Sequence, residues 1–299
     1  MVRMNTTPAA VLEKHRALTS LPLSLRNARE LGGIVLRDGR RVRRGLLLRT
    51  TRLYEATEED LRRLREDYRL SLILDMRGES EIRRAPDPAL SGVKWVQTDI
   101  IDFDFLRENI LARVQGHVTE LPEQKDGQNF ASVDMIVAGA RAGARLGRSD
   151  LGLGSAYALY LESARGREKL GVFFHELAAC REGAALWHCH TGKDRTGIAA
   201  GLILEVLGAD WETIAADYET SNLFYEDEIS ALEQILREKG VEEELYPPVC
   251  GFAGVHLPML ENAWAYMKRE WGGAIGYLKG ACGVTEDELE ALRKRCIEE

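Results

Sequence analysis

The chain has 299 residues, 45% of them hydrophobic, and carries a net charge of −8 at pH 7. The hydrophobic content suffices for a buried core, and the negative charge argues against a general nucleic-acid-binding protein. Its five cysteines are scattered and odd in number, which argues against a disulfide framework.

The sequence does not predict a membrane protein. No apolar run reaches the roughly 18 residues of a transmembrane helix, and the N-terminal residues lack the apolar segment of a signal peptide. We expect a cytoplasmic protein, with export without a recognisable signal left open, and no oligomeric state is indicated. Because no repeat or linker occurs, we expect a single domain over residues 1–299.

The first predicted elements are a helix over residues 9–18 and an arginine-rich stretch that leads into a strand over residues 46–49. Asp38-Gly39 is typical of a hairpin turn, so the stretch is either a solvated basic hairpin or a basic rim beside an anion-binding pocket. Its arginines are Arg37, Arg40, Arg41, Arg43, Arg44, Arg49 and Arg52.

Residues 57–68 predict a helix with an N-capping threonine and an acidic first turn. The apolar residues 70–75 predict a buried parallel strand, which ends in Asp75 and is followed by Arg77 and Glu81. In open α/β sheets, ligands bind at the carboxyl ends of the strands, so Asp75 and Arg77 are candidates for an accessory role in the site. We interpret Glu81 as a residue that only caps and braces the turn.

A further strand is predicted over residues 93–98, and three aspartates, Asp99, Asp102 and Asp104, come after it. Residues 105–150 have a mixed pattern, which we interpret as a helical insertion. It is either a lid over a pocket or a set of ordinary surface helices.

Two predicted helices, over residues 155–163 and 167–180, precede the most informative stretch of the chain. There an apolar strand, a short glycine-containing turn and a helix over residues 196–207 follow one another. This order presents backbone N–H groups to an anion. The stretch is His188-Cys189-His190-Thr191-Gly192-Lys193-Asp194-Arg195-Thr196-Gly197.

Cys189 and Arg195 are the principal catalytic candidates. The helix N-terminus and the nearby guanidinium favour a thiolate, lowering the pKa of Cys189 from about 8.5 towards roughly 4–7. A thiolate is a nucleophile that can form a covalent intermediate with phosphorus. Arg195 can hold two oxygens of a tetrahedral oxyanion at once.

The other residues of the turn have supporting tasks. Asp194 is the preferred general acid, and Thr196 can donate to the sulfur as it becomes a leaving group. Gly192 allows a close backbone approach or a positive φ, and His188 can orient the loop from below. The loop N–H groups would bind the remaining anionic charge, so the predicted substrate-binding residues are His190, Thr191, Gly192, Lys193 and Thr196.

Two other interpretations of this stretch fail. A nucleotide-binding P-loop requires Ser or Thr after the lysine, where Asp194 stands, and a glycine where Trp187 stands. A zinc site fails because consecutive residues cannot easily converge on one tetrahedral ion, and no second Cys/His pair has ligand spacing. We therefore expect no metal and no other cofactor.

The pattern His188-Cys189-x-x-Gly192-x-x-Arg195-Thr196 resembles the signature of the cysteine-dependent protein tyrosine phosphatases. The full stretch is similar to the bacterial branch that reads HCxxGKDRTG. Two further segments resemble this branch: the opening Asn27-x-x-x-Leu31-Gly32-Gly33, and Asp217-Tyr218-x-x-Ser221-Asn222. Ala28, Glu30, Glu219 and Thr220 depart from its usual residues.

The resemblance implies an α/β phosphatase fold, with a largely parallel sheet of four or five strands between helices and a helical lid-like insertion. It implies hydrolysis through a cysteinyl-phosphate, acting on phosphotyrosine and on phosphoserine, phosphothreonine or phosphoinositides. Lys193 matches a loop lysine associated with phosphoinositide binding, and Asp194 matches the proposed general acid. The implied partner is thus a phosphorylated protein or a phosphoinositide.

Several alternatives stay open within this reading. In other phosphatase branches the acid comes from a loop, so Asp99, Asp102 or Asp104 could replace Asp194. Asp75 could assist the acid or orient Arg195. A dedicated phosphoinositide phosphatase is the nearest competing function, and a phospho-ligand-binding pseudoenzyme is a more distant one. A sulfur transferase or arsenate reductase lacks the loop's Lys-Asp-Arg-Thr run.

The C-terminal third predicts helices throughout. Gly208 ends the signature helix, and Asp210 caps the next one. Residues 226–244 are acidic and helical, which indicates a solvated face, and closing helices are expected over residues 256–277 and 285–297.

Overall fold

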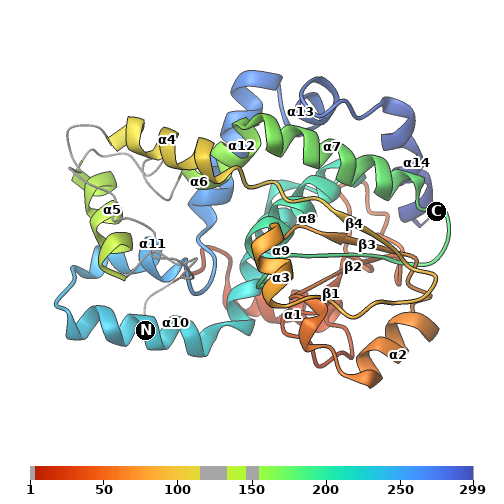
Figure 1. The fold of residues 1–299 in the computed structure, drawn as a ribbon, viewed down its shortest axis with the longest axis horizontal. Helices are drawn as coiled ribbons and strands as arrows, with labels where there is room; N and C mark the ends of the chain where they lie inside the picture. The colour runs from red at the N-terminus through yellow and green to blue at the C-terminus, as the bar shows by residue number, and fades with distance from the viewer. Residues whose placement is uncertain (1–3, 115–132, 146–154, 299) are drawn as a thin grey trace.

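The computed structural model describes residues 4–114, 133–145 and 155–298. A five-stranded sheet runs through its larger part, with helices on both sides (Figure 1). In spatial order the strands are β1 (Arg29–Glu30), β2 (Leu47–Thr50), β5 (Ala185–His188), β3 (Leu72–Asp75) and β4 (Lys94–Gln97). Only the β1–β2 pair is antiparallel, which confirms the predicted α/β class and largely parallel sheet.

The helices agree with most of the predicted ranges. Thr57, Asp210 and Thr285 accept hydrogen bonds from the first turns of their helices, and Gly208 ends the signature helix at a φ of 93°. The helical elements are α1 (Ala9–Thr19), η1 (Leu53–Glu55), α2 (Glu58–Glu66), α3 (Glu79–Arg84), α4 (Phe103–Val114), α5 (Val133–Arg145), α6 (Ala156–Glu162), α7 (Ala164–Ala179), α8 (Asp194–Leu207), α9 (Trp211–Thr220), η3 (Ser221–Phe224), α10 (Glu226–Glu238), η4 (Glu243–Leu245), α11 (Tyr246–Cys250), α12 (Leu257–Trp271), α13 (Ala274–Gly280) and α14 (Glu286–Cys296).

The strands bury both faces because alternate side chains point to opposite sides. Leu72, Leu74 and Trp187 pack into the core under α7, α8 and α14, whereas Ile73 and Leu186 pack towards α2. The strand β5 lies in the middle of the sheet, and α8, which follows its loop, is buried on nearly all sides. The loop between them is therefore held by rigid elements at both ends.

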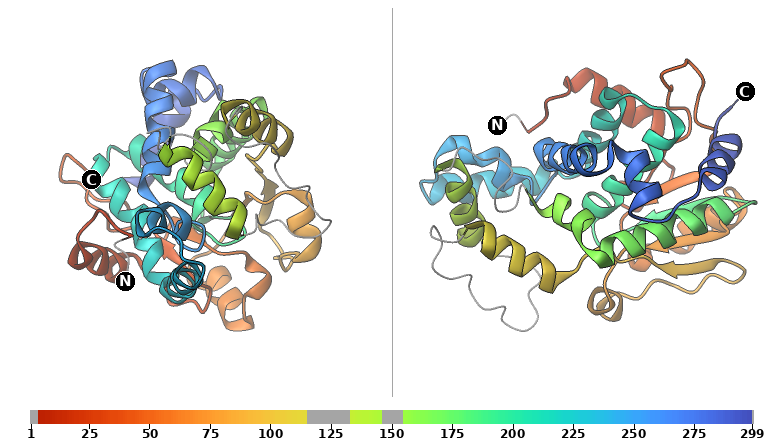
Figure 2. Two further views of the ribbon diagram at one scale, coloured as in Figure 1. Left: turned by 90° about the vertical axis from the view of Figure 1, so that its left-hand side faces the viewer. Right: turned by 90° about the horizontal axis from the view of Figure 1, so that it is seen from above.

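A second group of helices, α4, α5, α10 and α11, lies beyond the carboxyl end of the sheet (Figures 1 and 2). Its core combines residues of α5, α10 and α11, including Ile136, Ile229 and Val249. The predicted insertion over residues 105–150 thus contains helices α4 and α5, while its residues 115–132 and 146–150 lie outside the described part. A lid function stays a prediction.

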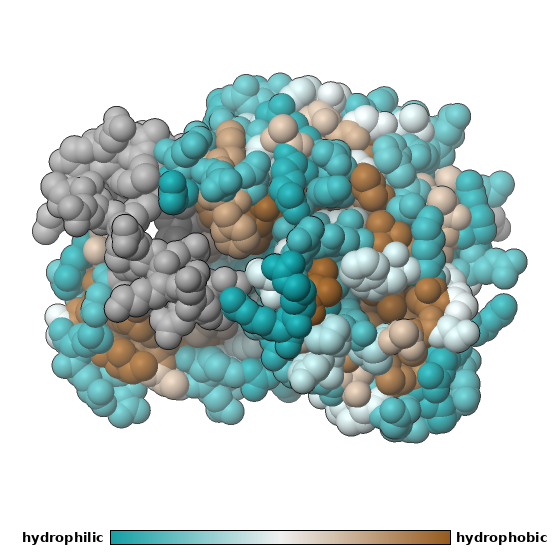
Figure 3. All heavy atoms as spheres, viewed as in Figure 1, coloured by the Kyte–Doolittle hydropathy of each residue, from teal (hydrophilic) through white to brown (hydrophobic). Residues whose placement is uncertain are grey.

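The molecular surface is mixed in character. Hydrophilic residues cover much of the face seen in Figure 3, with separate hydrophobic areas between them. The acidic helix α10 exposes Glu226, Asp227 and Glu238 and buries Ile229 and Leu236, so most of its charges are solvated. Among the described helices, none combines the length and apolar character that a bilayer-spanning segment requires.

A buried ion cluster joins α9 to the sheet. Asp217 lies 3.0 Å from Arg29 Nη1 and 2.6 Å from Arg49 Nη1, and it faces His15 at 3.3 Å. Burial alone would raise the pKa of Asp217, but the two guanidinium groups hold it well below its usual range. The carboxylate therefore stays charged and compensates two arginines that have no access to water.

We expect Asp217→Asn to lower the free energy of unfolding by about 3–5 kcal/mol, because it leaves two buried guanidinium groups without their counter-charge. Since the pKa is depressed in the folded state, this stabilisation is present above about pH 4 and is lost as the pH falls below that. Urea unfolding at several pH values measures both effects. The exposed Asp227→Asn is the matched control, and equal stability of the two variants would contradict the prediction.

Candidate active site

The signature stretch forms a loop between the carboxyl end of β5 and the N-terminus of α8. β5 ends at His188, Cys189 follows it directly, and α8 begins at Asp194 with Lys193 as its N-cap. This is the predicted strand, turn and helix. The loop stands at the sheet edge where parallel strands end, as expected for an open α/β fold.

Three consecutive carbonyl groups of the loop accept hydrogen bonds from donors outside the loop and therefore point away from its centre. The Thr51 hydroxyl donates to His190 O at 2.9 Å, and the Tyr225 hydroxyl donates to Thr191 O. Gly192 O accepts from the Asn27 amide at 2.8 Å and the Arg49 guanidinium at 3.0 Å. A trans peptide directs its N–H opposite to its C=O, so this bonding turns the intervening N–H groups inward, where they can bind an anion.

Gly192 is required by both its backbone angle and its surroundings. Its φ is 65°, in the region that favours glycine. A Cβ atom at this position would lie 2.3 Å from Thr50 O, far inside van der Waals contact. The loop can therefore approach β2 closely only because this residue has no side chain, which confirms the reason predicted for it.

Cys189 is buried, with an exposed fraction of 1%. Burial would raise the pKa of its thiol, but the charge of Arg195 and the proximity of Thr196 outweigh it and bring the pKa below its ordinary value. The thiolate is thus favoured where a nucleophile would be needed. Thr196 Oγ1 is buried without a hydrogen-bond partner among the described residues, so its donation to the departing sulfur stays a prediction.

Arg195 is fixed by Glu81, contrary to the expectation that Glu81 only braces its own turn. Its Nη1 and Nη2 each donate to a Glu81 oxygen at 2.7 Å, and Nη1 also donates to Met76 O at 2.8 Å. Glu81 caps Gly78 N as expected, but it also orients the guanidinium. A guanidinium has five N–H donors, and three of them are used here. The Nε–H and the second Nη2–H, which lie on one edge of the group, remain for a bidentate ligand.

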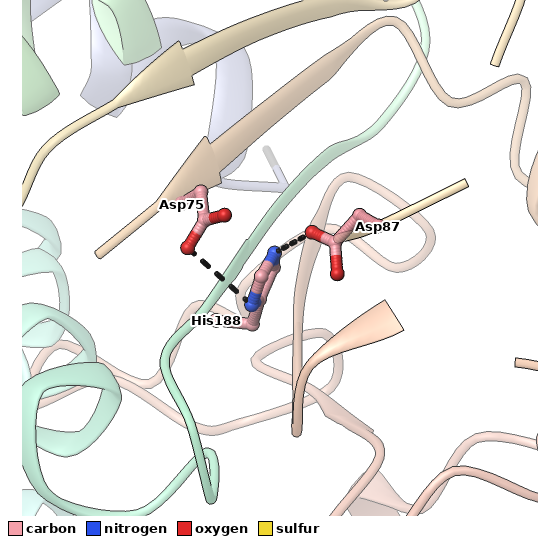
Figure 4. A group of neighbouring side chains, drawn as sticks. All are labelled: Asp75, Asp87 and His188. Atoms are coloured by element: carbon pink, nitrogen blue, oxygen red, sulfur yellow. Dashed lines mark ion pairs between the residues drawn. The ribbon is translucent and has the colours of Figure 1, made fainter. Parts of the chain in front are cut away.

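Asp75 and Arg77 do not orient Arg195. Asp75 lies with Asp87 around the ring of the buried His188 (Figure 4), and Arg77 joins this cluster through ion pairs to both carboxylates. Arg77 Nη2 lies 2.7 Å from Asp75 Oδ2 and 2.9 Å from Asp87 Oδ1, and His188 Nε2 lies 2.8 Å from Asp87 Oδ2.

The charges of this cluster compensate one another. Burial would lower the pKa of His188, but Asp87 and Asp75 raise it above its ordinary value. Two carboxylates thus face one guanidinium and one histidine ring whose protonated form they favour. Although Asp75, Asp87 and His188 lie close enough to hold a metal ion, Arg77 already occupies both carboxylates, and the donor set does not fit a cation.

Lys193 points its ammonium group at backbone carbonyls rather than away from the protein. The buried Nζ lies 2.6 Å from Phe252 O, 2.5 Å from Gly254 O and 3.5 Å from Gly251 O. These carbonyls follow α11, so the lysine connects the loop to the second group of helices. This contact was not expected from the sequence.

Two aspartates remain as acid candidates. Asp194 is half-buried, and its Oδ1 accepts a hydrogen bond from the Tyr157 hydroxyl. Asp99 is buried between Arg165 at 3.1 Å and Arg195 at 3.8 Å, and burial raises its pKa. By contrast, Asp102 accepts from Phe105 N at the start of α4, and Asp104 is exposed on that helix.

The arginine-rich stretch is largely a hairpin and not a rim of the loop. Leu36 N bonds to Arg40 O across the predicted turn, which confirms the hairpin. Only Arg49 and Arg52 contact the loop, the latter through the half-buried ring of His190, whose pKa is lowered by burial and by Arg52. The remaining five bond elsewhere: Arg37 to Ala209 O, Arg40 to Asp38, Arg41 to Gly33 O, Arg43 to Ile297 O and Arg44 to Glu30.

Several contributing residues were missed in the sequence. Asp87 lies between two prolines, Pro86 and Pro88, a setting that restricts the backbone and could have marked it. Asn27 entered only as part of a resemblance, and its φ of 56°, which marks it as special, is seen only in the structure. Tyr157 carries no signal of its own, because its contact with Asp194 depends on how α6 packs.

Comparison with known proteins shows the family of this chain. The profile of the tyrosine phosphatase family matches residues 22–298, and the chain belongs to this family. A protein of Cupriavidus necator, provisionally named a tyrosine-protein phosphatase, is 26% identical over 272 residues, 89% of this chain and 85% of that protein. The chain is accordingly a phosphatase.

Two other relatives match over shorter regions. The tyrosine-protein phosphatase of Nostoc commune is 36% identical over 145 residues, 48% of each chain. The triple specificity protein phosphatase PtpB of Mycobacterium tuberculosis is 31% identical over 117 residues, 36% of this chain and 42% of that protein. The chain thus spans less than half the length of these two relatives.

We expect Glu81→Gln to lower kcat/KM about tenfold to hundredfold, because Arg195 loses the charged partner that sets its orientation, and small displacements of a binding group are costly. Steady-state kinetics with an aryl phosphate measure the change. Glu79→Gln, on the exposed side of the same helix, is the matched control. Wild-type kinetics in the Glu81 variant would show that the pair does not matter.

Proposed function

We propose that the chain hydrolyses phosphate monoesters through a cysteinyl-phosphate intermediate on Cys189. The proposal rests chiefly on one observation: a thiol with a lowered pKa lies beside a fixed guanidinium, at the base of a loop whose carbonyls are bonded outward. Such a site binds a tetrahedral dianion and presents a nucleophile to it.

The reaction proceeds in two steps. The thiolate attacks phosphorus, the bond between phosphorus and the ester oxygen breaks, and Asp194 gives its proton to the departing oxygen. Asp194, now ionised, takes a proton from water as that water attacks the cysteinyl-phosphate; the sulfur–phosphorus bond breaks, which restores the thiolate of Cys189 and releases phosphate. Arg195, through its free edge, and the loop N–H groups of residues 190–195 stabilise the charge in both steps, while Thr196 donates to the sulfur as it departs.

We propose phosphotyrosine as the main substrate class, with phosphoserine, phosphothreonine and phosphoinositides as further substrates. The triple specificity in the name of the PtpB relative supports this breadth. A dedicated phosphoinositide phosphatase is the alternative, but the bonding of Lys193 to backbone carbonyls does not favour it. A pseudoenzyme is disfavoured because nucleophile, arginine and acid candidates are all present.

We further propose that residues 1–299 form one domain in the cytoplasm, with α4 and α5 as a lid. The family match over residues 22–298 supports the single domain, and the position of the two helices near α6 and α11 supports the lid.

Cys189→Ser is expected to abolish turnover of a phosphotyrosine peptide, a phosphoserine peptide and a phosphoinositide, because a serine hydroxyl is not ionised at neutral pH. Tungstate, a phosphate mimic, should still bind, since Arg195 and the loop N–H groups remain. Phosphate release and calorimetry measure the two properties. Cys180→Ser, at a partly exposed cysteine away from the loop, is the control, and residual activity of the Cys189 variant would refute the mechanism.

The identity of the acid is tested by leaving-group dependence. Asp194→Asn should lower turnover of phenyl phosphate about a hundredfold or more, the contribution of a general acid, and affect p-nitrophenyl phosphate far less, because nitrophenolate leaves without a proton. Asp99→Asn should affect both substrates alike, through its contact with Arg195. The reverse pattern would make Asp99 the acid.

A further inference from the structure

Two buried tyrosines stand in line behind Asp194. The hydroxyl of Tyr157, on α6, bonds to Asp194 Oδ1, and the hydroxyl of Tyr218, on α9, lies 3.0 Å from that of Tyr157. Each ring is 1% exposed, and the two rings meet edge to face with centroids 6.3 Å apart. Elements far apart in the chain therefore converge on one carboxylate oxygen.

Which group donates in each of these two hydrogen bonds follows from the number of hydroxyl protons. Each hydroxyl has one proton to donate. An ionised Asp194 can only accept, so Tyr157 donates to it, and Tyr218 must donate to the oxygen of Tyr157. Burial raises the pKa of both phenols well above the ordinary value, so both remain neutral donors across the working pH range.

The surroundings hold this pair in place. The ring of Tyr157 stacks on Tyr160 with centroids 5.9 Å apart. The ring of Tyr218 lies against Gly197 of α8, where a Cβ atom would come within 3.0 Å of it. Tyr218 also follows Asp217, the residue that binds Arg29 and Arg49. The same helix that anchors the loop thus anchors the outer tyrosine.

We propose that Tyr157, supported by Tyr218, is a positioning residue for Asp194. It occupies Oδ1, so that the other oxygen, Oδ2, which lies 3.5 Å from Lys193 Nζ, gives the proton to the leaving oxygen and later receives one from water. This inference rests on the proposed function, in which Asp194 is the general acid. It adds that the acid is oriented from α6, the first helix after the insertion, and not by the loop alone.

The test compares Tyr157→Phe with Tyr277→Phe. Both remove a buried hydroxyl, but that of Tyr277 donates to Leu161 O and has no part in the line to Asp194. For Tyr157→Phe we expect kcat/KM on phenyl phosphate to fall about tenfold and that on p-nitrophenyl phosphate to change less than about threefold, a partial loss of general-acid catalysis. Tyr218→Phe should show the same pattern more weakly.

A double-mutant cycle separates positioning from a structural role. In an Asp194→Asn background, Tyr157→Phe should have no further effect, so the two changes are non-additive. Tungstate binding and thermal unfolding, measured for every variant, report on folding.

Three outcomes would overturn the inference. The first is an additive effect of Tyr157→Phe and Asp194→Asn. The second is a Tyr157→Phe variant whose kinetics on both substrates match those of Tyr277→Phe, although Asp194→Asn shows the loss expected of a general acid. In those cases the proposed function survives. If Asp194→Asn itself behaves like the wild type, the acid assignment fails and the positioning role fails with it.

Discussion

The structure depends on where the carbonyl groups of one short loop point. A loop that is to bind an anion must direct its N–H groups inward, and it can do so only if its carbonyls find donors elsewhere. Here those donors are Asn27, Arg49, Thr51 and Tyr225, which come from three separate places in the chain. The fold around the loop is therefore part of its chemistry, and Gly192 allows the closest of these approaches.

Charge is compensated at each level beneath and beside this loop. Glu81 faces Arg195, Asp217 faces Arg29 and Arg49, and the carboxylates of Asp75 and Asp87 face Arg77 and His188. Burying these charged groups costs free energy, and removing one member would leave its partner buried and uncompensated. The members of each group are therefore held in one arrangement. The overall negative charge of the chain is thus compatible with anion binding, because the donors that would hold the anion, the free edge of Arg195 and the N–H groups of the loop, act locally.

The local sequence pattern was enough to predict most helices and strands and the residues of the loop itself. Cys189 and Arg195 stand six positions apart between a strand and a helix, and that geometry follows from the sequence. The residues that contact Cys189 and Arg195 were harder to predict, because their contacts depend on long-range packing. Glu81 was interpreted as a brace of its own turn, but its carboxylate lies opposite Arg195 only once β3 and β5 are paired. Asp87, Tyr157 and the carbonyls around Lys193 likewise become neighbours only through tertiary structure.

Lys193 shows how such packing bears on substrate choice. An ammonium group has three protons, and three carbonyls after α11 lie within hydrogen-bonding distance of it. A second phosphate on a substrate could bind this lysine only by taking its protons from those carbonyls, which would be left buried without partners. The α11 turn would then have to move, together with the helices that share its core. Under the proposed function, we therefore expect binding of a second phosphate at Lys193 to require a displacement of the second group of helices, whereas binding of a single phosphate in the loop requires none.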